Sequence, residues 1–260
     1  YVTPAWATQV FPELSEADAV EKLWKAVFDA SRISVDDPIS EWNQHNENLR
    51  IRAAKMNDAN FEYLHYTSEK VNLEVGLAKG HIWEGGASPT SKGVIFNANI
   101  PTEEIFTTPD RNNVNGWVMS TKPLFYRGTI IKDIVAKFKD GKVIEITSST
   151  GQDVLLDLIN EDEGASYLGE VALVPDNSPI SNTGILFNET LFDENASCHL
   201  AFGQSYSSCM TTIENETREE YIARGGNFST VHTDWMIGDS TTKIYGVKNG
   251  KYTPIIENGE

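Results

Sequence analysis

The chain has 260 residues, of which 40% are hydrophobic and 10% aromatic, so it is long enough to fold around a sizeable buried core. Its 38 acidic and 21 basic residues give a formal charge of -17. A surface this acidic repels phosphate, which argues against nucleic acid as a partner, although it is compatible with cation binding. No apolar run approaches the length of a membrane span, so no membrane partner is expected.

The cysteine count bears on the compartment. Cys198 and Cys209 are the two cysteines of the chain. One disulfide would be possible, but so low a count favours a reducing environment. We therefore expect a cytoplasmic protein.

The first sixty residues have the spacing of helices. Ser15, followed three residues later by Asp18, is a capping-box-like helix start, and apolar residues then recur at helical spacing as far as Phe28. A second helix is predicted to begin near Pro38, because proline is favourable in a first turn. His45 lies in this helix among Asn and Gln, and we expect it at the surface. Residues 1–60 are thus predicted to form a helical N-terminal part of the domain, its helical entrance.

From Phe61 onward the spacing becomes that of strands. Asp140-Gly141 and Asn249-Gly250 are strong signals for tight hairpins. The stretch 110–116, DRNNVNG, resembles a calcium loop but lacks acidic residues in the required register, so it predicts an Asn-rich turn. Residues 61–260 are therefore a strand-rich part, with short helices predicted over 153–159 and 217–224. The expected fold class is α+β, with mixed, largely antiparallel sheets and helices packed at one side.

Two histidines stand out on predicted strands. In the segment CHLAF, Cys198, Leu200 and Phe202 alternate with His199, which places the histidine on the face opposite the apolar residues. In VHTD, His232 and Asp234 are two positions apart, so on a strand both side chains point the same way and can bind one cation together.

Carboxylates in apolar surroundings add to this picture. Glu170 interrupts the apolar strand YLGEVALV, and a buried carboxylate is costly unless it is paired or bound to metal. Glu103 and Glu104 follow a Pro-Thr turn within NIPTEEIF. Neighbours on an extended segment point opposite ways, so only one of these two can face a given site.

Three carboxylates and two imidazoles suit a pair of divalent ions that share one bridging carboxylate. Five protein ligands leave coordination positions open for water and substrate, which indicates catalysis rather than a structural role. A mixed nitrogen and oxygen set accepts Zn, Co, Mn or Mg. The predicted metal ligands are Glu104, Glu170, His199, His232 and Asp234.

Four sequence blocks resemble one known family. NIPTEEIFTTPD, YLGEVALVP with the following SPIS, LFDENASCHLAFGQSY and NFSTVHTDWMIG are similar, in that order, to the thermophilic-type metallo-aminopeptidases, the aminopeptidase T / AmpS / PepS family. The earlier GHIWEGG segment is also similar. The resemblance implies a metal-dependent aminopeptidase that releases N-terminal amino acids from peptides, that works as a homodimer, and whose catalytic region spans 1–260. It further implies an N-terminal α/β domain ahead of this region that the chain does not include.

The resemblance also implies residue roles. Glu104 would bridge two ions, with Glu170 and His199 completing the shell of one ion and His232 and Asp234 that of the other.

Two further residues are expected to act in catalysis. Tyr206 would sit beside the metals and donate a hydrogen bond to the developing oxyanion. Glu103, next to the bridging Glu104, is a candidate general base. The alternative is that Glu103 points away from the site, as extended geometry favours. Glu170 or a metal-bound hydroxide would then need no other base.

Three other interpretations remain open from the sequence. A zinc-stabilised structural or binding module could use Cys198, His199, Cys209 and His232 as ligands. A metal-free glycoside hydrolase could pair Glu104 with Glu170. The chain could also be an inactive dimerising domain.

Overall fold

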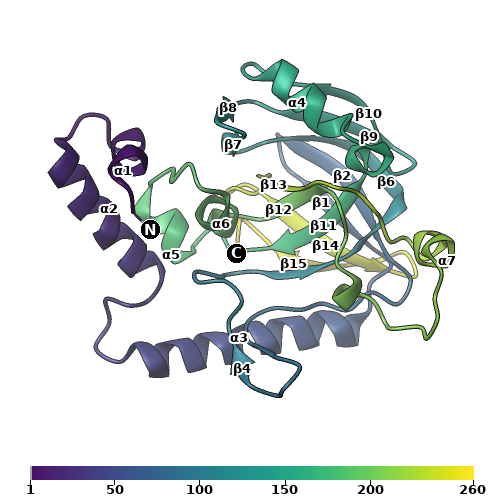
Figure 1. Cartoon of the computed structure of the whole chain (residues 1–260). Coiled ribbons are helices and arrows are strands. Elements are labelled where there is room, and N and C mark those ends of the chain that lie inside the picture. The colour runs from purple at the N-terminus through teal and green to yellow at the C-terminus, as the bar shows by residue number, and fades with distance from the viewer. Residues whose placement is uncertain (1) are drawn as a thin grey trace.

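The fold is described from a computed structural model, which describes residues 2–260. Three helices come first: α1 (Pro4–Val10), α2 (Glu16–Ala30) and α3 (Pro38–Ala59). The side chain of Ser15 caps α2 by accepting from the backbone N–H of Asp18, as predicted, and Asp37 caps α3 in the same way. Helix α1 was not predicted. Figure 1 shows α1 and α2 beside the strand-rich body and α3 running along its base.

The larger sheet has seven antiparallel strands in the order β10-β9-β6-β2-β1-β14-β15. Both predicted hairpins are confirmed, since the Asp140-Gly141 turn joins β9 to β10 and the Asn249-Gly250 turn joins β14 to β15. The strands are β1 (Tyr63–Thr67), β2 (Val71–Leu77), β6 (Pro109–Met119), β9 (Val135–Lys139), β10 (Lys142–Thr147), β14 (Lys243–Lys248) and β15 (Lys251–Ile256).

The smaller sheet has four antiparallel strands in the order β13-β12-β11-β5. They are β5 (Ile105–Thr107), β11 (Leu168–Leu173), β12 (His199–Gly203) and β13 (His232–Met236). Two short ribbons pair β3 (Ser88–Pro89) with β4 (Ile95–Phe96) and β7 (Leu124–Tyr126) with β8 (Thr129–Ile131). The remaining helices are α4 (Gln152–Ile159), α5 (Pro179–Thr183), α6 (Thr190–Asp193), α7 (Arg218–Ala223) and the 3-10 turns η1 (Glu163–Ser166), η2 (Glu194–Ala196) and η3 (Ser207–Cys209).

One hydrophobic core joins the two sheets. Phe202 of β12 is fully buried and stacks on Trp235 of β13 at 5.0 Å and on Phe138 of β9, in the other sheet, at 6.4 Å between ring centroids. A separate small cluster, which includes Leu23, packs α1 and α2 against α5 and α6. The α+β class with antiparallel sheets is confirmed. Within residues 2–260, no helix is both long and apolar enough to cross a bilayer.

Two predictions about local structure were wrong. The stretch 110–116 is not a turn but part of β6, where Val114 pairs with Val75 and Gly116 with Leu73 of β2. Pairing with β2 overrides the local preference of Asn for turns. His45 is only 8% exposed, because this side of α3 packs against the loop that contains Thr102.

Candidate metal centre

The register of the smaller sheet places two carboxylates on one face. Ala201 of β12 pairs with Glu170 of β11 on one side and with Asp234 of β13 on the other. Residues that are directly opposite on paired strands point to the same face. Leu200 and Phe202 therefore take the opposite face, where both are fully buried in the core.

Both histidines lie on the same face as these carboxylates. His199 is two residues from Ala201 along β12, and His232 pairs with Gly203 at the other end of the strand. Ala172, which pairs with His199, is also on this face. The small side chains between the polar ones leave space above the sheet, so the polar groups can converge there.

Glu104 reaches the same space from the edge strand. Phe106 of β5 pairs with Ala172, which puts Phe106 on the site face, and Glu104 lies two residues before it. Glu103 has the opposite parity. Its carboxylate is held by Arg32, with Nη2 at 2.9 Å from Oε2 and Nη1 in contact with Oε1. The structure thus brings Glu104 to the cluster and does not bring Glu103 there.

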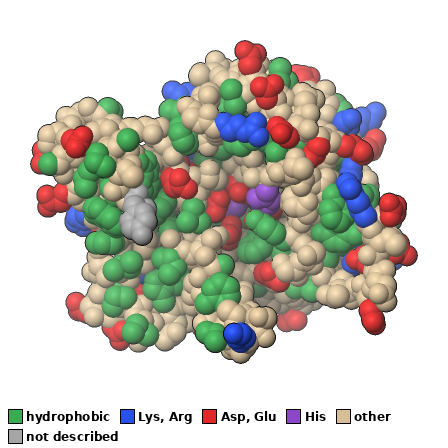
Figure 2. All heavy atoms as spheres, in the orientation of Figure 1, with side chains coloured by type: hydrophobic (Ala, Val, Ile, Leu, Met, Phe, Trp, Pro, Cys, Tyr) green, Lys and Arg blue, Asp and Glu red, His purple; other side chains and the backbone are tan. Residues whose placement is uncertain are grey.

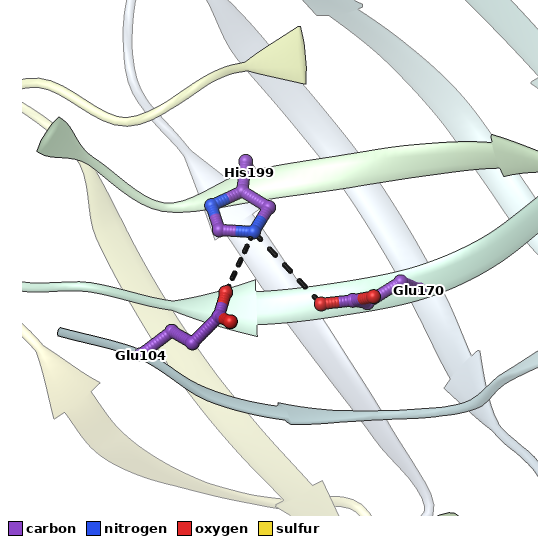
Figure 3. A group of neighbouring side chains, drawn as sticks. All are labelled: Glu104, Glu170 and His199. Carbon is purple, nitrogen blue, oxygen red and sulfur yellow. Dashed lines mark ion pairs between the residues drawn. The ribbon is translucent and has the colours of Figure 1, made fainter. Parts of the chain in front are cut away.

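Contacts among the five side chains form two groups that share Glu170. His199 Nε2 lies 2.9 Å from Glu104 Oε2 and 3.9 Å from Glu170 Oε1, as drawn in Figure 3. His232 Nε2 lies 3.2 Å from Glu170 Oε2 and 3.5 Å from Asp234 Oδ1. Glu170 therefore lies near both histidines. The role expected for Glu104, as the bridge between two ions, stays a prediction.

Backbone carbonyl groups orient both imidazoles. Nδ1 of His199 lies 3.1 Å from the carbonyl oxygen of Ser197, and Nδ1 of His232 lies 2.7 Å from that of Gln204. A carbonyl only accepts, so Nδ1 donates in each case. Each Nε2 then faces the cluster. A hydrogen-bond acceptor at Nδ1 fixes the tautomer and the ring orientation in this way when a histidine binds metal.

The five side chains line a cavity of about 350 Å³. In Figure 2 histidine and acidic side chains meet in a hollow near the middle of the molecule. Tyr206, which follows β12, is 43% exposed and also lines this cavity, with its ring centroid 4.8 Å from that of His232 and 5.8 Å from that of Phe106. Tyr206 is therefore close enough to meet a molecule bound beside the cluster.

Burial and like charges shift the acid–base properties of the cluster. Burial raises the pKa of Glu170 to about 7, and the carboxylates of Asp234 and Glu104 add to this rise. Burial would lower the pKa of His232, but the nearby carboxylates of Asp234 and Glu170 outweigh that effect and raise the pKa to about 11. The cavity thus attracts positive charge, and a divalent cation would displace protons when it binds.

The donor atoms do not satisfy one another by hydrogen bonds, whereas a bound metal ion would satisfy them. Glu104 Oε2, His199 Nε2 and Asp234 Oδ1 are buried and have no hydrogen-bond partner within residues 2–260, although the first two lie 2.9 Å apart. Unpaired buried polar groups are costly unless another partner satisfies them. Glu104, Glu170 and His199 form one set of donors within 4.8 Å of one another, and Glu170, His232 and Asp234 form a second. Imidazole and carboxylate together suit divalent transition metals.

Sequence reasoning missed Glu194. This residue is 8% exposed and lines the cavity. Burial, together with the charges of Asp234 and Glu104, raises its pKa well above the ordinary value. Its signal in the sequence was weak, because LFDEN reads as an ordinary charged helix end.

Neither cysteine lies with the histidines in a group that could hold a metal. Cys198 points to the face opposite His199, where its thiol donates to the carbonyl oxygen of Val174 at 3.2 Å. Burial raises the pKa of Cys198 to about 12, so its thiolate form is disfavoured. Among residues 2–260, the groups of side chains that could hold a metal contain neither cysteine.

Comparison with known proteins decides the family. The model of the family described as thermophilic metalloprotease (M29) matches residues 1–260. The chain belongs to this family.

Named relatives cover the whole chain at similar identity. Aminopeptidase T from Thermus aquaticus is 44% identical over 100% of this chain and 63% of its own length. Aminopeptidase 2 from Geobacillus stearothermophilus is 45% identical over 99% of this chain and 62% of its own length. The solved structure of wild-type AmpT from Thermus thermophilus matches with a TM-score of 0.92 at 44% identity, over 100% of this chain and 63% of that one. The chain therefore spans less than two thirds of the length of these M29 relatives.

Proposed function

We propose that this M29 chain is the catalytic region of a metal-dependent aminopeptidase that releases N-terminal amino acids from peptides. The observation that carries the proposal is the pair of donor sets sharing Glu170 on the floor of an open, acidic cavity. Membership of a metalloprotease family, with relatives named as aminopeptidases, supports the peptide as the substrate class.

The five side chains would hold two divalent ions. Glu104, Glu170 and His199 would hold one, and Glu170, His232 and Asp234 the other. Ions held there supply Lewis acidity, which lowers the pKa of water and polarises a carbonyl group. Zn, Co, Mn and Mg all remain compatible with this donor set.

The surrounding residues would bind and orient the peptide. The acidic cavity attracts the positively charged amino terminus, which favours cleavage of the first peptide bond. The hydroxyl group of Tyr206 would donate a hydrogen bond to the oxygen of the tetrahedral intermediate. Glu103 is given no part in proton transfer, because Arg32 holds its carboxylate.

Compartment and assembly belong to the same proposal. Cys198 and Cys209 are free and buried, which suits the reducing cytoplasm. A homodimer follows from the resemblance of the chain to its family.

The proposal is tested by substitution and by chelation. Glu104→Ala and His232→Ala should each abolish cleavage of an aminoacyl chromogenic amide, because each removes one donor from a set of three. A chelator should stop the wild-type chain, and added Zn²⁺ or Co²⁺ should restore it. His65→Ala is the matched control, since His65 contacts Asn72 on the surface of the larger sheet, and it should keep wild-type activity.

The same experiments separate the rival interpretations. Hydrolysis of a glycoside that persists in chelator would favour the pairing of Glu104 with Glu170 in a metal-free enzyme. Loss of metal from the double variant Cys198→Ser, Cys209→Ser would favour a zinc-stabilised module. Metal binding without cleavage of any peptide would contradict the aminopeptidase assignment and leave the inactive domain.

A further inference from the structure

Polar contacts from distant parts of the chain converge on the turn that carries Glu104. This turn, residues 101–103, immediately precedes Glu104 and contacts Arg32, which follows α2, and His45 of α3. We call the three side chains that hold it, Arg32, His45 and Asn195, the turn clamp. None of the three belongs to the donor sets described above.

Arg32 holds the side chain of Glu103. Arg32 follows the end of α2, and its guanidinium group makes a two-pronged contact with the Glu103 carboxylate. The two side chains are only 12% and 6% exposed. Two-pronged contacts of this kind fix both distance and orientation. The pair also neutralises a carboxylate that would otherwise lie, unpaired and buried, next to Glu104.

His45 and Asn195 hold the backbone of the same turn. Nε2 of His45 lies 2.7 Å from the carbonyl oxygen of Thr102, to which it donates. The backbone N–H of Glu103 donates to Oδ1 of Asn195 at 2.7 Å, and Nδ2 of Asn195 donates to the carbonyl oxygen of Leu191 at 2.8 Å. Asn195 is fully buried. Both contacts therefore hold the same peptide group, the one that joins Thr102 to Glu103 just before Glu104.

We propose that the turn clamp positions Glu104 as a metal ligand, so that the N-terminal helices set the affinity of the centre for its metal. The inference rests on the proposed metal centre but not on peptide cleavage. Glu104 lies at the edge of the smaller sheet, just before β5, whereas the other four donors lie within paired strands. It is thus the donor whose backbone most needs support from outside the sheet.

The test measures metal binding directly. Wild type, Glu103→Gln and Glu103→Ala are stripped of metal and titrated with Co²⁺, and binding is followed by calorimetry and by the visible absorption of bound Co²⁺. Loss of a residue that orients a metal ligand typically weakens binding about 10- to 100-fold. We expect Glu103→Ala to fall in this range and Glu103→Gln, which keeps a hydrogen-bond acceptor for Arg32, to lie between it and wild type. Asn195→Ala should weaken binding as well.

A matched control comes from a similar ion pair whose two residues do not line the cavity. Arg224 contacts Glu216 through Nε at 2.6 Å and Nη2 at 2.8 Å, and the two side chains are 13% and 12% exposed. Glu216→Ala removes a comparable charge pair and should leave Co²⁺ affinity unchanged. Thermal unfolding of each stripped variant checks that the fold is retained, and Arg32→Lys provides a milder change if Glu103→Ala does not fold.

Measurements of kcat distinguish a positioning role of Glu103 from a direct role in proton transfer. At saturating metal, Glu103→Gln should regain most of the wild-type kcat, because the ligand is then held by the metal itself. Wild-type Co²⁺ affinity in Glu103→Ala and Asn195→Ala would overturn the inference. A kcat that stays abolished at saturating metal, with unchanged affinity, would overturn it too and return Glu103 to proton transfer. A wild-type chain that binds Co²⁺ but cleaves no peptide would contradict the aminopeptidase proposal alone.

Discussion

At the scale of single residues, neighbouring side chains have separate tasks because a strand alternates its faces. Glu103 and Glu104 are adjacent, yet one meets Arg32 on the helical side and the other meets His199 in the cavity. The alternation of an extended segment predicts that only one of the two can face the site. Which one does so depends on the pairing of Phe106 with Ala172, a contact between strands distant in sequence.

Tyr206 gives a prediction at this scale. Burial and the charge of Glu170 raise the pKa of its hydroxyl group above the ordinary value, so it stays protonated and able to donate at neutral pH. Tyr206→Phe should lower kcat on the order of a hundredfold, as is typical when one oxyanion donor is removed. Co²⁺ affinity should not change, because a hydroxyl group that stays protonated is a weak metal ligand. Steady-state kinetics beside calorimetry checks this, and an unchanged kcat would remove Tyr206 from the reaction.

At the scale of elements, hydrogen bonds to Asp162 hold the segment that leads into β13. The carboxylate of Asp162 accepts from the backbone and side chain of Thr230 at 2.6 and 2.8 Å, from Ser229 at 2.8 Å and from the N–H of Ala165 at 2.9 Å. These contacts tie η1 to the segment that enters β13 at His232.

Asp162 predicts a defined pH dependence. Burial raises its pKa, but the hydrogen bonds from Thr230, Ser229 and Ala165 outweigh this and lower it from 3.8 to about 2. A folded-state pKa below the unfolded value contributes stability that is present above pH 3.8 and is lost as pH falls through about 2. Asp162→Asn should therefore be less stable than wild type near pH 6, with the difference shrinking toward pH 2. Denaturant unfolding at several pH values measures this, and a constant difference would contradict it.

Helix α3 shows how an element can serve the site without entering it. Its polar side chains bond three segments that border the cavity. Asn57 exchanges hydrogen bonds with the backbone of Trp83, Asn46 pairs with the amide of Asn97, and His45 holds Thr102. The helical spacing in the sequence predicted the helix, but it did not predict that this polar side would be covered.

At the scale of the whole molecule, the two sheets depend on one shared core. Phe202 is fully buried between Trp235 and Phe138, on the reverse side of the strand that carries His199. Phe202→Ala should lower the free energy of unfolding by about 3–5 kcal/mol, since it loses apolar burial and leaves a cavity. Phe96→Ala, at a site that is 43% exposed, should change it by less than about 0.5 kcal/mol. Denaturant titration compares the two, and equal losses would show that the sheets do not share this core.

The sequence by itself determined the strands that carry the two histidines and Glu170, the two hairpins and the residue types of the centre. Period-two alternation in CHLAF and VHTD is a local property of the chain, so it reveals which side chains share a face without knowledge of the fold. The interruption of an apolar strand by Glu170 is likewise visible locally, because burying an unpaired carboxylate is unfavourable in any fold.

Tertiary structure alone decided how these pieces meet. The shared place of Glu170 between His199 and His232, the capture of Glu103 by Arg32, the burial of His45 and the strand at 110–116 all depend on partners far away in sequence. Such contacts are fixed by the register between strands and by helix packing, and neither leaves a periodic trace in the chain. The physical reason is that alternation sets the direction of a side chain, whereas only packing sets what it meets there.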